Sequence, residues 1–405
     1  MGKNHGASVI SVARFFVQLL ELNPLSEAVQ KVVERHSSVA VQANLSDSGE
    51  SLYSPKDLLD SPGSGGLSSD RQGDEFRFPS APTMPCGFFT FLLLVAVGSV
   101  AHAQLGGHAG AYSRMGFGAE GMGMANALTA VSHGDLYGYY NPAVLPFAEH
   151  KTLAASFGVL SLDRRLNFIS YSQALAPEAG IGIAIINSGV GEIDGRDSDG
   201  EPTGTLSTSE NQIILSFANR FKAGFSVGIN LKFLQSHLYT DINSFTVGVD
   251  VGVLVPVSSD LTLGGSVRDI NSKYKWDTAT LYGQSGNSTT DEFPLLYTVG
   301  ASYALPGGVA ALAVDVELSN QQTFVIRSGA EFQLAPEVTL RGGIDRIDLK
   351  EEGSGVRPAL GLTFRTSPGT SLPLVNPESL GFSYAYLFEP FSTSGIHMIS
   401  LTVRL

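Results

Sequence analysis

Residues 225–233 read FSVGINLKF and residues 245–253 read FTVGVDVGV, and these two stretches decide the fold. In both, large apolar residues alternate with Gly, Ser, Thr, Asn, Asp or Lys. An extended chain with this pattern has one apolar face and one polar face, because successive side chains of a strand point to opposite sides. The same period of two recurs at residues 312–318 and 360–364. A strand that separates lipid from a polar lumen requires this pattern.

Alternating segments of this kind continue from residue 150 to the end of the chain. About fourteen can be counted, and many run ~9–11 residues, the length that crosses a bilayer at a tilt. The segments are 152–160, 166–175, 180–188, 210–219, 223–236, 245–255, 260–270, 295–304, 308–319, 323–333, 337–347, 356–366, 379–387 and 396–405. We therefore expect an all-β transmembrane fold, an antiparallel outer-membrane β-barrel of about fourteen strands over residues 151–405.

The connections between these segments separate a membrane barrel from a soluble β-sandwich, whose strands also alternate. One set is short and rich in turn residues, at 176–178, 219–222, 256–259, 306–307 and 335–336. The other set includes two long polar stretches, 189–209 and 271–294, which we expect to be outer loops. Segment 367–378 is a longer exception on the short side. This asymmetry favours the barrel and places both chain termini in the periplasm.

Composition limits the remaining classes. No stretch approaches the ~18 consecutive apolar residues of a spanning helix, and hydrocarbon cannot satisfy the edges of an open sheet. The formal net charge of −13 argues against a nucleic-acid partner. The single cysteine, Cys86, excludes an internal disulfide.

A signal peptide is predicted at residues 84–103, in an unusual place. An apolar run at 88–97 is followed by Ala101-His102-Ala103, a small-x-small cleavage box that places the mature start at Gln104. The alternative is a buried core helix. Residues 1–83 combine an amphipathic stretch at 9–33 with a Ser-, Gly-, Asp- and Pro-rich run at 46–82. We interpret them as a non-native or disordered extension, with translation starting at Met84; a genuine pre-region is the alternative.

The period of two breaks between residues 104 and 150. Glycines at 116, 118, 121 and 123 make this segment too irregular for a strand and permit close backbone approach. The methionines among them provide adaptable apolar surface. A lone Gly-x-Gly here is no dinucleotide-binding motif, because the strand–turn–helix context is missing.

These motifs carry a resemblance to a known family. Arg114-Met115-Gly116, Gly121-Met122-Gly123, Asp135 and Tyr140-Asn141-Pro142-Ala143 resemble the PorV/PorQ family of outer-membrane proteins, which is similar to the FadL-type long-chain fatty acid transporters. Family members usually carry Asn-Pro-Ala-Gly-Leu, and Val144 replaces that glycine here.

The resemblance implies that residues 104–150 form a hatch, or plug, inside the barrel. In fatty-acid transporters the hatch helps to control passage of a hydrophobic ligand; in the PorV-like branch it accompanies a role in type IX protein secretion. Candidate residues for the ligand pocket are Met115, Phe117, Met122 and Met124. The alternative for Asn141, Pro142 and Ala143 is a plain turn that fixes the plug to the wall.

Other candidate sites are weaker. Asp194, Asp197, Asp199 and Glu201 could offer oxygen ligands to calcium, but they miss the EF-hand spacing and favour a solvated acidic loop. The charges predicted to face the lumen, which we expect to pair with one another, are Lys232, Asp250, Arg268, Asp315, Glu317, Arg341, Asp345, Arg357 and Arg365.

The scattered histidines show no metal spacing and no serine motif points to a nucleophile, so neither an enzyme, a metal nor a cofactor is expected. The sequence leaves two functions open. In one, the barrel handles a hydrophobic small molecule at the outer membrane, among its lipids. In the other, it is an accessory or shuttle component that acts through secretion-system or cargo proteins.

Overall fold

The computed structural model describes residues 107–135, 137–239, 241–347, 355–366, 379–390 and 392–405. The predicted signal peptide, residues 1–83 and the connection 367–378 lie outside the described residues. No helix among the described residues is long and apolar enough to span a membrane.

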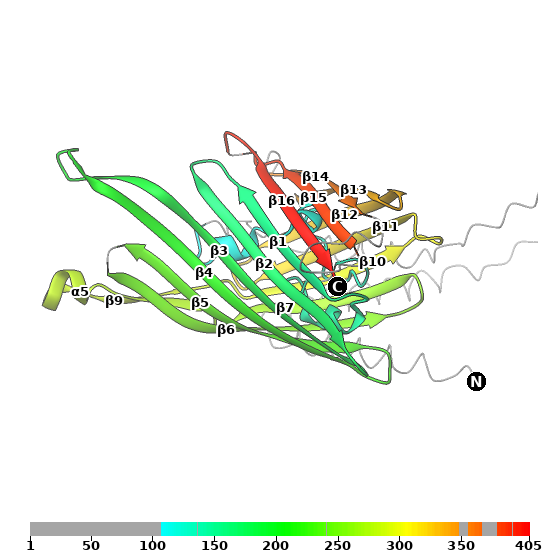
Figure 1. Cartoon of the computed structure of the whole chain (residues 1–405). Coiled ribbons are helices and arrows are strands. Elements are labelled where there is room, and N and C mark those ends of the chain that lie inside the picture. The colour runs from blue at the N-terminus through cyan, green and yellow to red at the C-terminus, as the bar shows by residue number, and fades with distance from the viewer. Residues whose placement is uncertain (1–106, 136, 240, 348–354, 367–378, 391) are drawn as a thin grey trace, which may run out of the picture. The chain divides into compact units, whose positions relative to one another are not determined.

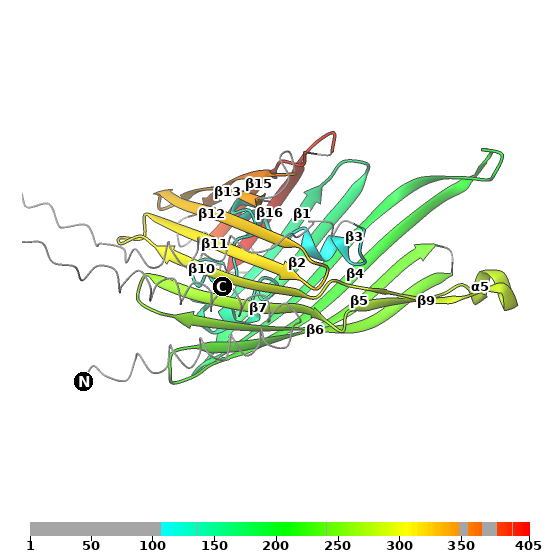
Figure 2. The ribbon, with the colours of Figure 1, turned by 180° about the vertical axis from the view of Figure 1, so that it is seen from behind.

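Fourteen strands of the described chain form one closed antiparallel barrel, in which the first strand pairs with the last (Figures 1 and 2). They are β1 (Thr152–Val159), β2 (Arg164–Leu175), β3 (Ala179–Arg196), β4 (Pro202–Arg220), β5 (Ser226–Tyr239), β6 (Ile242–Pro256), β7 (Leu261–Ile270), β10 (Leu296–Ala304), β11 (Ala310–Ser319), β12 (Phe324–Ala335), β13 (Val338–Ile347), β14 (Arg357–Arg365), β15 (Ser379–Leu387) and β16 (Ile396–Arg404). Each predicted segment corresponds to one of these strands. The closed antiparallel barrel is confirmed.

Two predictions about loops were wrong. Residues 189–209 were expected to form a loop, but β3 and β4 stay paired as far as Arg196 and Pro202. Residues 271–294 hold a second hairpin of β8 (Lys273–Asp277) and β9 (Ser288–Glu292), with α5 (Ala279–Tyr282) and the short helix η3 (Gly283–Ser285) at its tip. Beyond the bilayer both strand faces can be polar, so β9 and the ends of β3 and β4 lack the apolar alternation of the other strands, and β8 shows it over five residues only.

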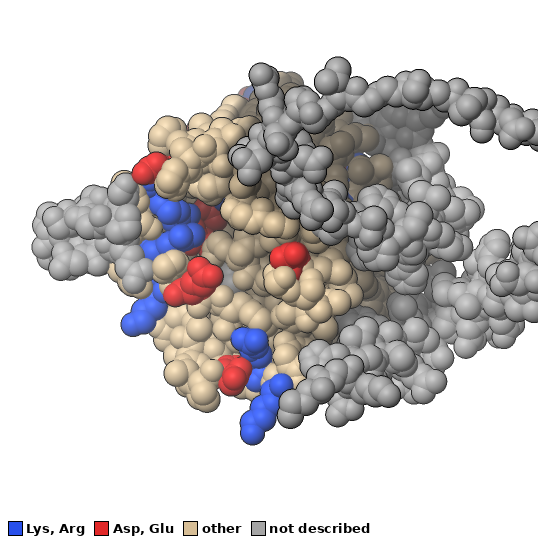
Figure 3. Space-filling view, turned by 90° about the vertical axis from the view of Figure 1, so that its right-hand side faces the viewer, with Lys and Arg blue, Asp and Glu red and all other residues tan. Residues whose placement is uncertain are grey.

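Both hairpins project from the same end of the barrel, as the two opposite views show (Figures 1 and 2). We call this end the long-hairpin rim. The opposite end, where connections such as 221–225 and 257–260 are brief, is the short-turn rim. Seen from that side, acidic and basic side chains lie beside one another on the visible part of the rim (Figure 3).

The outer face of the barrel is apolar and the inner face is polar. On β5, Val227, Ile229 and Leu231 are exposed, whereas Asn230 and Lys232 between them are buried. The same division holds on β14, where Leu360 and Phe364 are 57% and 56% exposed and Thr363 is buried. Exposed aliphatic and aromatic side chains on a closed barrel form a lipid-facing surface.

Residues 107–150, here called the inner segment, fill the lumen. The segment contains η1 (Ala111–Arg114), α4 (Ala119–Gly123) and η2 (Pro142–Phe147). Helix α4 lies against β13 to β16 and η2 lies against β2 to β6. The segment therefore touches opposite parts of the wall.

Inward-facing glycines let the inner segment approach the wall. A Cβ added to Gly361 on β14 would lie 2.9 Å from the Cα of Gly123 and 3.3 Å from the Cβ of Arg341. The first of these neighbours is backbone and has little freedom to move. This close contact accounts for part of the high glycine content.

We expect Gly361→Ala to destabilise the barrel by about 1–3 kcal/mol, because an extra methyl group in a packed site forces the backbone apart. Gly342→Ala is the matched control, since its added Cβ would meet nothing closer than 3.8 Å. The measurement is urea unfolding in lipid vesicles. Equal midpoints for the two variants would contradict the close contact.

Candidate functional site

Arg114 holds the start of the inner segment together. Its guanidinium donates hydrogen bonds to the carbonyl oxygens of Ala109 at 2.8 Å, Gly110 at 3.1 Å and His108 at 3.2 Å. Gly116 follows with a φ of +90°, where an added side chain would meet the Asn126 amide. The Arg-x-Gly spacing of the motif therefore fixes a folded turn.

Two of the four residues predicted to line a ligand pocket lie in a closely packed core. Phe117 and Met122 are fully buried. The Phe117 ring lies 4.7 Å from Tyr139 and 5.5 Å from Phe168, centroid to centroid. Met115 packs against the same cluster at its edge. Their part in ligand binding stays a prediction.

Asn141, Pro142 and Ala143 anchor the inner segment to the wall. The Asn141 amide donates to the carbonyl oxygens of Thr129 at 2.7 Å and of Val253 on β6 at 3.1 Å. Its side-chain oxygen accepts from the Ala143 amide at 3.0 Å and caps η2. The residues act as the turn that fixes the segment to the barrel.

A cluster of buried charges joins the inner segment to the strands near the short-turn rim. Asp135 accepts hydrogen bonds from Arg365 on β14 and from Arg404 on β16, both at 2.7 Å. Glu120 on α4 lies 3.5 Å from Arg365. Burial raises the pKa of Asp135, but Arg365 and Arg404 outweigh it and hold this pKa below its usual value. Burial and the neighbouring Asp135 raise the pKa of Glu120.

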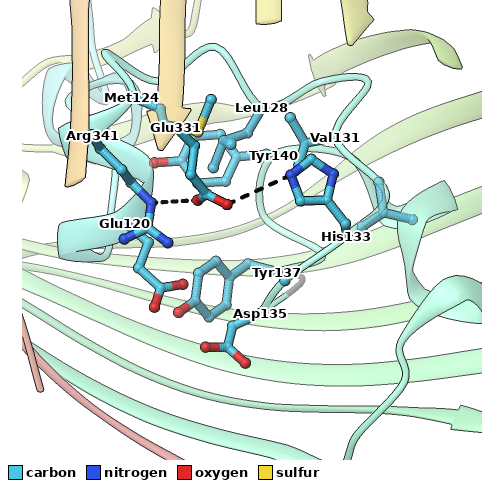
Figure 4. A pocket seen from close by; sticks show the side chains of 12 residues that line it. Glu120, Met124, Leu128, Val131, His133, Asp135, Tyr137, Tyr140, Glu331 and Arg341 are labelled. Atoms are coloured by element: carbon cyan, nitrogen blue, oxygen red, sulfur yellow. Dashed lines mark hydrogen bonds and ion pairs between the residues drawn. The ribbon is translucent and has the colours of Figure 1, made fainter. Parts of the chain in front are cut away.

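A small cavity of about 30 Å³ lies beside this cluster (Figure 4). Met124, the remaining pocket candidate, lines it. Glu331 accepts a hydrogen bond from Arg341 at 2.7 Å and lies 3.8 Å from His133. This volume holds one or two water molecules and no organic ligand.

The other lumen charges form two further clusters. Lys232 contacts both Asp250, at 2.8 Å, and Asp269. Glu317 accepts hydrogen bonds from Arg268 at 2.6 Å and from Arg327 at 3.0 Å. Arg327 also forms an ion pair with Asp345 at 2.8 Å. The prediction that the lumen charges pair with one another is confirmed for Lys232 with Asp250 and for Arg268 with Glu317. Asp345, Arg341 and Arg365 pair instead with charges that were not predicted. The remaining two predicted lumen charges also have partners: Asp315 accepts from the Thr129 amide and Arg357 contacts Glu389.

The acidic stretch considered for calcium forms a tight turn instead. One oxygen of Asp197 accepts from the backbone amides of Asp199 at 3.0 Å and Glu201 at 2.9 Å. Within the described part of the chain, no group of three or more His, Cys, Asp or Glu residues is arranged to hold a metal ion.

The large cavity lies at the long-hairpin rim, and we call it the vestibule. Its volume is about 690 Å³, within the usual range for small-molecule sites. Residues 107–111 of the inner segment line it, together with residues of β4, β5, β8 and β9. The inner segment therefore separates the vestibule from the rest of the lumen.

Aromatic residues of the β8–β9 hairpin form part of the vestibule's wall. Tyr274 and Trp276 line it, and their ring centroids lie 5.2 Å apart. Phe293 packs edge-on against Tyr274 at 5.0 Å, and its ring occupies the space where a side chain at Gly110 would stand. The rings thus hold the hairpin against the inner segment.

Two hydrogen bonds orient acidic groups in the vestibule. The Tyr274 hydroxyl donates to Glu210 at 3.0 Å, and the Trp276 indole donates to Asp291 at 2.7 Å. Tyr274 and Trp276 lie in the stretch 271–294, which was expected to be an outer loop, so sequence reasoning missed the site. The cue was present in the alternation of Tyr274 and Trp276 with Lys273 and Lys275.

No protein-family model and no curated protein matches the sequence. Solved structures do match. CymD, a monoaromatic hydrocarbon channel, aligns with a TM-score of 0.50 at 13% identity, over 71% of this chain and 96% of its own. The toluene transporter TodX of Pseudomonas putida aligns with a TM-score of 0.50 at 11% identity, over 71% and 96% of the two chains. The fold is FadL-like.

In the described part of the chain, the barrel combines a filled lumen with a large cavity at the long-hairpin rim. The toluene transporter TbuX of Ralstonia pickettii also matches, with a TM-score of 0.48 at 12% identity, over 71% of this chain and 97% of its own.

Proposed function

We propose that this FadL-like barrel takes up a small, largely hydrophobic molecule across the outer membrane, with the vestibule as its first binding site. The observation that carries the proposal is the 690 Å³ cavity, which has aromatic walls and a floor formed by the inner segment. The inner segment acts as the hatch, and the long-hairpin rim faces the outside, with both termini in the periplasm. The structural neighbours CymD, a monoaromatic hydrocarbon channel, and TodX, a toluene transporter, support this class of ligand.

The filled lumen means that uptake requires the inner segment to shift. The cavity beside Glu120 and a second one near Arg114 hold only about 30 and 20 Å³. A ligand of even seven carbon atoms does not fit in them. We infer a gated conduit, in which binding precedes movement of the hatch.

Uptake of labelled toluene by Gram-negative cells tests the proposal. Cells that carry the chain in the outer membrane are expected to take up toluene several-fold faster than cells without it. Trp276→Ala, which removes a wall of the vestibule, is expected to reduce the gain, whereas Phe382→Ala on the lipid-facing side of β15 is expected to preserve it. Equal uptake with and without the chain would refute the proposed function.

A second candidate is an accessory role in type IX-like secretion, acting through protein partners, which would place the chain in the PorV/PorQ branch. The motif around Arg114 and the exposed tip of the β8–β9 hairpin favour it. At that tip Tyr282 is 65% exposed and Leu281 is 38% exposed. A secretion component of this kind would leave toluene uptake unchanged, so the same assay separates the two functions.

A further inference from the structure

The vestibule is acidic, and this restricts the ligands that it suits. Three carboxylates line it: Glu210 on β4, and Asp291 and Glu292 on β9. None of its lining residues within the described chain is a lysine or an arginine. A purely hydrocarbon ligand uses only the aromatic part of this lining, because it gains nothing from the charge and has to displace water from the carboxylates. It is therefore expected to bind less tightly than a ligand of the same size that also carries a positive charge.

One cation lies beneath the vestibule and does not cancel this charge. Arg114 points its guanidinium at the carbonyl oxygens of residues 108–110, which form part of the lining. Lys273 stands opposite Glu292 in the β8–β9 hairpin, so three carboxylates face two cations and the surroundings of the vestibule stay net negative. Two histidines, His108 and His237, also line it.

The carboxylates retain capacity to accept further hydrogen bonds. Glu210 accepts a hydrogen bond from Tyr274, and Asp291 accepts one from Trp276, each through one carboxylate oxygen. An ionised carboxylate accepts at about four lone-pair positions on two oxygens. The aromatic donors therefore orient Glu210 and Asp291 and leave acceptor positions for a ligand.

The arrangement suits an organic cation rather than a metal ion. No group of three or more His, Cys, Asp or Glu in the described chain is placed to hold a metal. Aromatic rings stand beside the acids, and a ring face attracts an ammonium group by about 0.5–2 kcal/mol. A protonated amine attached to an apolar body would use the carboxylates and the rings together.

We propose that the vestibule selects small aromatic amines in their protonated form, with Asp291, Glu292 and Glu210 receiving the ammonium group beside Trp276. This inference rests on the proposed function and names its ligand class. Selection takes place at the long-hairpin rim, before the hatch moves.

The chain provides its own reporter for this site. Trp276 is the only tryptophan in the sequence, so intrinsic tryptophan emission reports on the vestibule alone. The experiment titrates the purified full-length barrel in detergent, at pH 8 and low salt, with benzylamine, benzyl alcohol and benzoate. Each probe contains a single benzene ring, but protonated benzylamine is positive, benzyl alcohol is neutral and benzoate is negative.

We expect benzylamine to bind at least tenfold more tightly than benzyl alcohol, and benzoate to bind most weakly. The double variant Asp291→Asn, Glu292→Gln is expected to reduce the preference for benzylamine to under threefold, while the amide oxygen introduced at position 291 still accepts from Trp276. Glu192→Gln is the matched control. Glu192 is an exposed carboxylate on β3, in the β3–β4 hairpin, and its side chain does not line the vestibule. Adding salt is expected to weaken benzylamine binding but not benzyl alcohol binding.

The outcomes separate the two levels of the proposal. If benzyl alcohol binds as tightly as benzylamine, or the double variant keeps the preference, the amine selectivity is refuted and the vestibule remains a site for neutral aromatics. If none of the three probes changes Trp276 emission at any concentration, the vestibule is not a ligand site and the proposed uptake function also loses its support.

Discussion

Replacing Asp135 by Asn is expected to lower the free energy of unfolding of the barrel by about 3 kcal/mol. The Asp135 side chain is fully buried and forms ion pairs with both Arg365 and Arg404, whose side chains are only 16% and 18% exposed. Asparagine keeps the shape but removes the carboxylate that both guanidinium groups contact, so Arg404 loses this ion pair and Arg365 keeps only that with Glu120, 3.5 Å away. Breaking a buried ion pair from one side costs more than its net contribution, because the remaining charge stays desolvated.

The measurement is urea unfolding of the folded barrel in lipid vesicles at pH 7.5. Glu178→Gln is the matched control at the same rim, since Glu178 and Arg220 form an ion pair in which both side chains are nearly half exposed. Exposed pairs of this kind contribute about 0–1 kcal/mol. A D135N midpoint equal to that of the control would show that Asp135 does not tie the inner segment to the wall.

The pH dependence of this difference has a definite sign. The arginines hold the pKa of Asp135 below its usual value, so its stabilising effect is fully present above the unfolded pKa of ~3.9. It is lost as the pH falls through the folded pKa. The gap between the wild-type chain and D135N is therefore expected to stay constant from pH 8 to about pH 5 and to narrow below it.

Deleting residues 107–131 is expected to convert an electrically silent barrel into an open pore. This removes η1, α4 and the packed core around Phe117, but keeps Asp135 and the hydrogen bond from Asn141 to Val253 on β6 that anchors η2. The two cavities described below the vestibule, beside Glu120 and near Arg114, have volumes of only about 30 and 20 Å³. Barrels of 16–18 strands leave an aqueous channel and those of eight are filled by side chains, so fourteen strands without a plug leave room for ions.

Planar-bilayer recording gives the result directly. The full chain is expected to show no steady current, and the deletion variant a steady ohmic current. Heat-modifiable electrophoretic mobility of the same samples shows whether the deletion variant forms a closed barrel. A folded deletion variant without current would mean that wall side chains, and not the inner segment, close the lumen.

The strands could be predicted from the sequence because each carries its own signal. The alternation at 225–233 lies within one strand and needs no knowledge of its neighbours. The lumen charges were also predictable as a set, since the period of two places Lys232 and Asp250 on the polar face. Their pairings were not predictable, because Glu317 meets arginines from β7 and β12, which only the closed sheet brings together.

The vestibule was less predictable for a different reason. It is assembled from the start of the inner segment, two barrel strands and the β8–β9 hairpin, which are far apart in the sequence. The hairpin at 271–294 was missed because the alternation in β8 covers only five residues and β9 is exposed along its whole length. Glu120 was missed because a lone acid in a glycine-rich stretch has no distinguishing spacing.

The position of the inner segment also constrains how the protein is made. The segment runs directly into β1, and β1 pairs with β16, the last strand to be synthesised. Asp135 already contacts Arg404 at the end of that last strand. A sheet that closed first would have to admit some forty folded residues through a rim, whereas an open sheet can wrap around them. We therefore expect the inner segment to take its place before β1 and β16 pair. The Asp135–Arg404 contact can form only when β16 has reached the inner segment.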